Sequence, residues 1–215
     1  MTTAGVFKEY PIPTANSSPN RITVGSDGNL WFTESSASKI GRLTPAGVFT
    51  EFPLPTANSY PWGIVAGPDG NLWFTEQSGN NVGRVSTTGT ITEFPIPTAG
   101  CFPIGIVAGA DGNLWFAEFL GSKIGRATPA GVITELPLPS TGGEPADVTL
   151  GPGGDLWFVE EGSFSSVSRM TAAGVFTAYV TPTPASGINQ IAVGGDGNLW
   201  FTEAQAHKIG RLVPP

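Results

Sequence analysis

Apolar and polar residues follow a pattern of short strands and turns along this chain. From Val48 to Pro55 the two kinds alternate and end in prolines, which cannot donate to a β-ladder, so this segment predicts an edge strand. Residues 63–67 (GIVAG) form a short apolar run, typical of a strand buried on both faces. The Asp69-Gly70 turn follows, and residues 72–76 and 81–87 predict two more strands. No segment carries an uninterrupted helical period.

This unit of four strands recurs five times. Its tryptophans are spaced by 42, 42, 42 and 43 residues, and they are Trp31, Trp73, Trp115, Trp157 and Trp200. Glycines that open the units keep the same spacing, and they are Gly5, Gly47, Gly89, Gly131 and Gly174. A fixed period of this length with four strands per unit is typical of propeller blades. The sequence therefore predicts an all-β, five-bladed β-propeller with four antiparallel strands per blade, folded as one domain over residues 1–215.

The two ends of the chain suggest how the ring closes. Residues 6–13 resemble the outermost strand of a blade, and residues 208–213 resemble a third strand with no fourth strand after it. Pairing the first with the last would complete the fifth blade and leave no open edge. We therefore expect a closed five-bladed monomer. Assembly of several chains into a larger ring is the alternative.

Composition excludes several classes of function. The net charge of −7 argues against nucleic acid as a partner, and no run of Lys or Arg suggests an anionic membrane. No apolar stretch approaches the length of a membrane span, and no signal peptide precedes the first repeat, so we expect a cytoplasmic or recombinant protein. Cys101 is the single cysteine, which excludes an intrachain disulfide and a Cys-based metal site. We expect no metal and no cofactor.

Two charged residues recur once per repeat. The glutamates are Glu34, Glu76, Glu118, Glu160 and Glu203, and the arginines are Arg42, Arg84, Arg126, Arg169 and Arg211. Because both recur in every copy, we interpret them as structural and expect the glutamates to pair within the blade or to accept from loop amides. The Asp-Gly-Asn motif lacks the alternating acidic positions and the distal Glu of a calcium loop, so we interpret it as a turn.

The sequence of the repeat resembles that of a known family. The segment ITEFPIPTAGCFPIGIVAGADGNLWFAEFLGSKIGRATPAG (residues 91–131) is similar to the streptogramin lyases, and the resemblance covers all five repeats. It implies a seven-bladed propeller that opens a cyclic depsipeptide antibiotic by elimination at its ester, with magnesium. Catalytic histidines of that family follow a proline just before the innermost strand. The matching positions here hold no histidine, and they are Asn20, Trp62, Ile104, Ala146 and Asn189.

The resemblance therefore implies the fold, but this sequence lacks the catalytic histidines of the family. Glu144-Pro145 matches one family context, yet Ala146 stands where the histidine would be. An elimination needs a base and an acid, and His207 is the only histidine. It stands between the second and third strands of its repeat, at the position of Ser38, Asn81 and Ser122. A lyase that uses His207 with Glu144 or Asp147 is the alternative to a protein without catalysis.

Positions where the repeats differ predict a binding site at the channel mouth, on loops held by a rigid frame. Apolar residues gather in the second and third repeats, and they are Tyr60, Trp62, Phe102, Ile104, Phe119 and Leu120. Polar residues stand in the others, and they are Asn20, Arg21, Glu144, Asp147, Glu161, Asn189, Gln190 and His207. We expect a cleft for a small amphipathic molecule.

The same residues also fit simple loop packing, or an apolar patch for self-association. The first function hypothesis is a non-catalytic scaffold or binding module, engineered or recently amplified. The second is the magnesium-dependent lyase, and the third is a partner-binding propeller that uses Tyr60, Trp62 and Phe102.

Overall fold

The computed structural model describes residue 5 and residues 7–139, 142–162 and 165–215, and this part of the chain is almost entirely β-structure. The first two repeats form β1 (Pro19–Val24), β2 (Leu30–Glu34), β3 (Lys39–Leu43), β4 (Phe49–Pro53), β5 (Pro61–Ala66), β6 (Leu72–Glu76), β7 (Asn81–Val85) and β8 (Ile91–Pro95). The third and fourth form β9 (Pro103–Ala108), β10 (Leu114–Glu118), β11 (Lys123–Ala127), β12 (Ile133–Pro137), β13 (Glu144–Leu150), β14 (Leu156–Glu161), β15 (Ser166–Met170) and β16 (Phe176–Val180). The fifth forms β17 (Ile188–Val193), β18 (Leu199–Glu203) and β19 (Lys208–Leu212).

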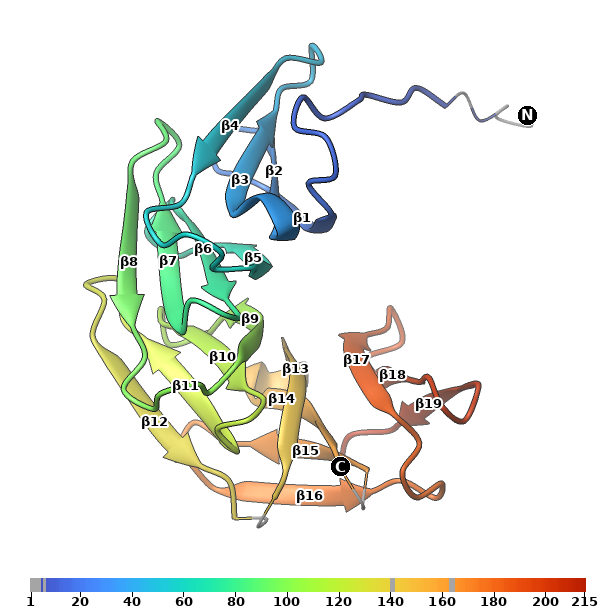
Figure 1. The fold of residues 1–215 in the computed structure, drawn as a ribbon. Coiled ribbons are helices and arrows are strands. Elements are labelled where there is room, and N and C mark those ends of the chain that lie inside the picture. Colours follow the sequence, from blue (N-terminus) through green and yellow to red (C-terminus); the bar gives the residue numbers. More distant parts are fainter. Residues whose placement is uncertain (1–4, 6, 140–141, 163–164) are drawn as a thin grey trace.

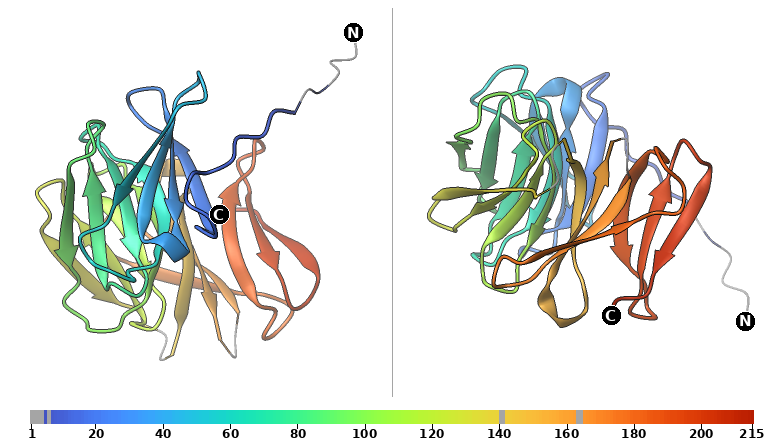
Figure 2. Two further views of the ribbon diagram at one scale, coloured as in Figure 1. Left: turned by 45° about the horizontal axis from the view of Figure 1, so that its top comes forward. Right: turned by 90° about the horizontal axis from the view of Figure 1, so that it is seen from below.

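Each repeat makes its own antiparallel sheet, as the sequence predicts. Strands follow one another in chain order, for example β1-β2-β3-β4, so the first strand of each repeat lies at one edge of its sheet. These first strands pack against one another from repeat to repeat, from β1 through β5, β9 and β13 to β17. Figures 1 and 2 show the sheets standing side by side as blades in a curved row. Single 3-10 turns are the helical segments of the described chain, and none is long or apolar enough to cross a membrane.

The predicted closure of the ring is wrong. In the described part of the chain no strand precedes Pro19, and the fifth sheet holds only the three strands β17-β18-β19. The first sheet (blue) and the fifth (red) stand at the two ends of the row with an opening between them (Figure 1). The first strands of neighbouring sheets contact one another in order from β1 to β17, and no contact of this kind joins β17 back to β1 among the larger contacts of the described chain. Five blades therefore form an open arc.

Aromatic side chains fill the space between neighbouring blades. Trp31 is fully buried and stacks on Phe52 with ring centroids 5.5 Å apart, and Trp73 stacks on Phe94 in the same way. The Asp-Gly-Asn turn supports the tryptophan of its own blade, since Oδ1 of Asp69 accepts from Trp73 Nε1 at 3.0 Å. These contacts confirm that the repeated residues build the blade.

The two ends of the arc expose residues that are buried in the inner blades. On the first blade Ile22 is 63% exposed, whereas its counterpart Ile64 is 8% exposed. On the fifth blade Trp200 is 37% exposed and Ile209 is 66% exposed, although the matching Trp73 is fully buried. Both ends of the described arc therefore expose an apolar face. In the inner blades the neighbouring blade covers the matching face.

Candidate functional site

A bulge at the start of each innermost strand sets the geometry of the channel mouth. Pro19 pairs with Glu34, and the register then shifts before Ile22 pairs with Phe32. The hydroxyl of Thr33 holds this bulge, because it accepts from the Arg21 backbone N–H at 3.1 Å and donates to the Trp62 carbonyl at 2.9 Å. Residues at the bulge therefore lie in fixed places between neighbouring blades.

Polar residues at the bulge position come together across the opening of the arc. Arg21 belongs to the first blade, Asp147 to the fourth and Gln190 to the fifth, and all three line one cavity of about 350 Å³. With its amide oxygen toward Arg21, Gln190 accepts from both terminal guanidinium nitrogens, and the distance to Nη2 is 2.7 Å. Trp200 and Ile209 supply apolar walls.

Asp147 is the acidic group among these three residues, and it is half-buried. Burial raises the pKa of its carboxyl, although the nearby Arg21 charge and a hydrogen bond from the Ile191 backbone N–H oppose the rise. The second and third blades hold glycine at this bulge. A side chain at Gly105 would clash, because a Cβ there would lie 2.6 Å from Asp147 Oδ1. Glycine thus leaves room for the Asp147 carboxylate.

Apolar residues of the second and third blades form aromatic pairs beside the mouth. Tyr60 stacks on Trp62 with centroids 6.2 Å apart, and Phe102 lies 6.3 Å from Phe119. Ile104 is buried. Tyr60 and Phe102 both have left-handed backbone, with φ of 54° and 58°, an uncommon conformation for bulky residues. The structure therefore pairs Tyr60 with Trp62 and Phe102 with Phe119, while Leu120 is exposed, and none of these residues lines the polar cavity.

Other predicted polar residues lie apart from that cavity. Glu144 pairs with Glu161 across β13 and β14. Burial and the Glu144 charge raise the pKa of Glu161, while a hydrogen bond from Asn189 opposes the rise. Asn20 and His207 are exposed. His207 has left-handed backbone like Asn80, so Asn80 is its counterpart in the second blade, and the expected match to Asn81 is wrong by one residue.

In the first blade, the repeated arginine and the repeated glutamate each have other neighbours than one another. Arg42 lies over the Trp31 ring and donates from Nη1 to the Thr87 carbonyl of the next blade at 3.0 Å. Glu34 is fully buried beside a second glutamate of its own blade, Glu51. Burial and the Glu51 charge raise the pKa of Glu34 to about 7, against the pull of a hydrogen bond from Ser17. The sequence missed this arrangement because Glu51 stands two strands away.

Magnesium would need oxygen ligands that converge on one point. Within the described ranges, no group of three or more His, Cys, Asp or Glu side chains is placed to hold a metal ion. The described protein side chains alone therefore do not fit a magnesium site.

Comparison with known proteins gives one consistent result. The family model described as the virginiamycin B lyase family matches residues 1–165. A streptogramin B lyase structure is 40% identical with a TM-score of 0.91, and the match covers 96% of this chain and 68% of that one. Virginiamycin B lyase from Staphylococcus aureus is 42% identical with a TM-score of 0.95, over 100% of this chain and 73% of that one. A catalytically inactive variant of that enzyme with quinupristin is 41% identical with a TM-score of 0.94, over 99% and 72% of the two chains.

Proposed function

The chain belongs to the virginiamycin B lyase family, and from that premise we propose that its channel mouth binds a cyclic peptide of the streptogramin B class without opening it. The observation that carries this proposal is the cluster of Arg21, Asp147 and Gln190 in a cavity with apolar walls. A guanidinium, a carboxylate and an amide can satisfy the peptide groups of such a ligand, and Trp200 can pack against its apolar side chains. The matching solved structure with quinupristin supports this ligand class.

The absence of histidine at the positions where the family resemblance expects it favours binding over catalysis. Elimination needs a base that accepts a carbon-bound proton near neutral pH, a role that histidine fills in many enzymes. Asn20, Trp62 and Asn189 are among the residues at the positions where the family resemblance expects histidine. His207 is exposed at the β18–β19 turn and is absent from the residues that line the cavity.

A lyase is the second candidate, and one observation favours it. Asp147 faces the cavity with a raised pKa beside the Arg21 guanidinium. A carboxylate with a raised pKa is a better base, and an adjacent cation can stabilise a leaving oxygen. In this candidate Asp147 takes the proton and Arg21 supports the oxygen that departs.

One experiment separates the two candidates. Quinupristin is titrated into the protein by calorimetry, and the same mixtures with magnesium are followed by chromatography for the opened ring. We expect saturable binding and no ring opening. Arg21→Gln should weaken binding about tenfold or more, because a hydrogen bond to a charged group contributes about 1.5–3 kcal/mol.

Arg84→Gln is the matched control, since Arg84 lies over Trp73 and donates to Pro129 in an inner blade, and it should bind as the wild type does. Ring opening that disappears in Asp147→Asn would establish the lyase instead. No binding of quinupristin to the wild type would refute both candidates.

A further inference from the structure

The interface between the third and fourth blades lacks an aromatic ring that other blades have. Phe52, Phe94 and Tyr179 stand on the outer strands of the first, second and fourth blades, each stacked on the tryptophan of its own blade. Leu136 occupies this position in the third blade, opposite Ile124 just as Phe94 is opposite Val82. Trp115 therefore has no aromatic partner among the described ring contacts of the chain.

Glycines in the next blade show where the missing ring would lie. A Cβ added to Gly89 would meet the Phe52 ring at 2.1 Å, and one added to Gly131 would meet the Phe94 ring at 2.0 Å. A Cβ added to the equivalent Gly174 would meet no atom within 4 Å. The space that a phenyl ring fills at the first two interfaces is therefore open at the third.

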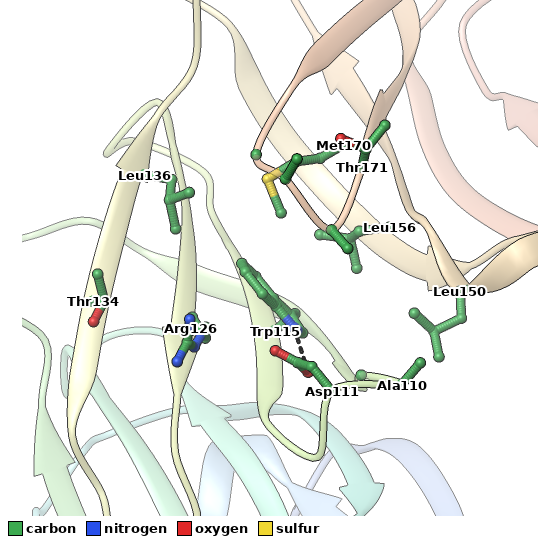
Figure 3. Close-up of a pocket in the computed structure, with 15 residues that line it drawn as sticks. Ala110, Asp111, Trp115, Arg126, Thr134, Leu136, Leu150, Leu156, Met170 and Thr171 are labelled. Carbon is green, nitrogen blue, oxygen red and sulfur yellow. Dashed lines mark hydrogen bonds between the residues drawn. The ribbon is translucent and has the colours of Figure 1, made fainter.

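This space belongs to a cavity of about 310 Å³. Its walls come from both blades, and Figure 3 shows Trp115, Arg126 and Leu136 on one side with Leu150, Leu156 and Met170 on the other. The turn between β9 and β10 also contributes, so the cavity lies at the end of the strands opposite to the channel mouth. A volume of this size accommodates a small aromatic molecule.

Arg126 supplies the polar group of this cavity. In the second blade Arg84 donates from Nη1 to the Pro129 carbonyl of the next blade at 3.0 Å, and Arg42 makes the same contact with Thr87. Arg126 lies over the Trp115 ring at 5.8 Å, but within the described residues it donates no hydrogen bond, and its Nε is buried without a partner. A guanidinium at this interface therefore lacks the oxygen acceptor that its two counterparts have.

Asp111 also lines the cavity, and its carboxylate accepts from its own turn and from Trp115 rather than from Arg126. Oδ1 accepts from Trp115 Nε1 at 3.1 Å, and Oδ2 accepts from Asn113 Nδ2 at 2.7 Å. The second blade has the same turn at Asp69, and there Arg84 donates to the Pro129 carbonyl and not to the aspartate. Asp111 thus leaves the Arg126 terminal nitrogens available to an acceptor.

We infer that this cavity, formed by Trp115, Arg126, Leu136 and Gly174, binds a small planar aromatic molecule that carries a carboxylate. The ring of the ligand takes the place of the absent phenyl ring, against Trp115 and Gly174. Its carboxylate accepts from Arg126, as the backbone carbonyl does at the other interfaces, and a charged acceptor makes the stronger bond. The site is independent of the channel mouth and of the function proposed there.

Phenylacetate is the probe, and the indole N–H signals of the six tryptophans are the readout by NMR. Trp115→Phe identifies the Trp115 signal. We expect a saturable shift of this signal with a Kd on the order of 1 mM, which is typical of a ligand with about ten non-hydrogen atoms. 2-Phenylethylamine, with the same ring and a cation, and isovalerate, an acid without a ring, should leave the signal in place.

Three variants test the two halves of the site. Leu136→Phe supplies the missing ring and should weaken phenylacetate binding at least tenfold while the protein stays folded, since Phe52 and Phe94 are accommodated at the same place. Arg126→Gln should weaken binding at least fivefold, and Arg84→Gln should leave it unchanged. An unmoved Trp115 signal, or undiminished binding by a folded Leu136→Phe protein, would overturn the inference. Equal binding of 2-phenylethylamine would overturn the role of Arg126.

Discussion

A fully buried carboxyl group beside a half-buried one should make the stability of this protein depend on pH, and Glu76→Gln isolates one such pair. Glu76 is fully buried, and its Oε2 accepts from Asn81 Nδ2 at 2.9 Å. Its Oε1 faces no donor, as expected if this oxygen carries a proton and donates to the neighbouring Glu93. Burial raises the pKa of Glu76 to about 8 with the help of Glu93, although the hydrogen bond from Asn81 opposes the rise.

The sign of the effect follows from the raised pKa. Between the ordinary value of 4.5 and about 8, the folded protein keeps a proton that the unfolded chain releases. The free energy of unfolding therefore falls as pH rises through this window, by about 1.4 kcal/mol per pH unit for this single group. Across the window the loss approaches about 5 kcal/mol, and above pH 8 this contribution stays constant.

The side chain introduced by Glu76→Gln resembles the protonated acid, because its amide can donate to Glu93 at any pH. Urea unfolding at roughly pH 5 should therefore give similar stability for Glu76→Gln and the wild type, and at roughly pH 9 the variant should be more stable by several kcal/mol. Glu9→Gln changes an exposed glutamate and should leave the wild-type dependence on pH unaltered. If Glu76→Gln loses stability with pH as steeply as the wild type does, the buried proton is not at Glu76.

Two further predictions concern the interfaces between blades. Trp73→Ala should cost about 3–5 kcal/mol because Trp73 is fully buried on Phe94, whereas Trp200→Ala at the open end should cost about 2 kcal/mol because Trp200 is 37% exposed. Urea unfolding of the two variants measures this contrast, and equal costs would mean that the end face is covered in solution. Burial raises the pKa of the Cys101 thiol to about 12, helped by the charge of Glu118, so a thiol reagent should label it only after unfolding. Rapid labelling of the folded protein, followed by mass spectrometry, would contradict this assignment.

The sequence predicts the blades better than it predicts the ring. Each strand and turn is repeated with its own burial pattern, so five copies support the same assignment of β5, β6, β7 and β8. Closure depends on one pairing between distant segments and on the angle between blades, and neither leaves a periodic signal. Residues 6–13 resemble an outer strand because their sequence matches the outer strands of the other repeats. A strand also has to pair with the edge of a sheet, and this pairing is not encoded in the repeat.

A sequence can point to candidate site residues where one repeat carries a different chemical type. Arg21 and Asp147 replace glycine at the bulge, and the sequence shows this change directly. The pairing of Glu76 with Glu93 is invisible by the same method, because both recur and the sequence does not show how close the carboxyl groups lie. Leu136 was also missed, since leucine and phenylalanine are both apolar and only the packing shows that a ring is absent.

Both proposed sites arise from the same physical cause. The repeated strands and turns of every blade fix the frame, so one substituted side chain changes the space that it occupies within this frame. Arg21 adds a charge where glycine stands in an inner blade, and Leu136 leaves empty the space that Phe94 fills. The two cavities lie at opposite ends of the strands and share no lining residue. Substitutions at distant sites without shared partners usually act independently. Leu136→Phe should therefore leave quinupristin binding unchanged, and Arg21→Gln should leave phenylacetate binding unchanged.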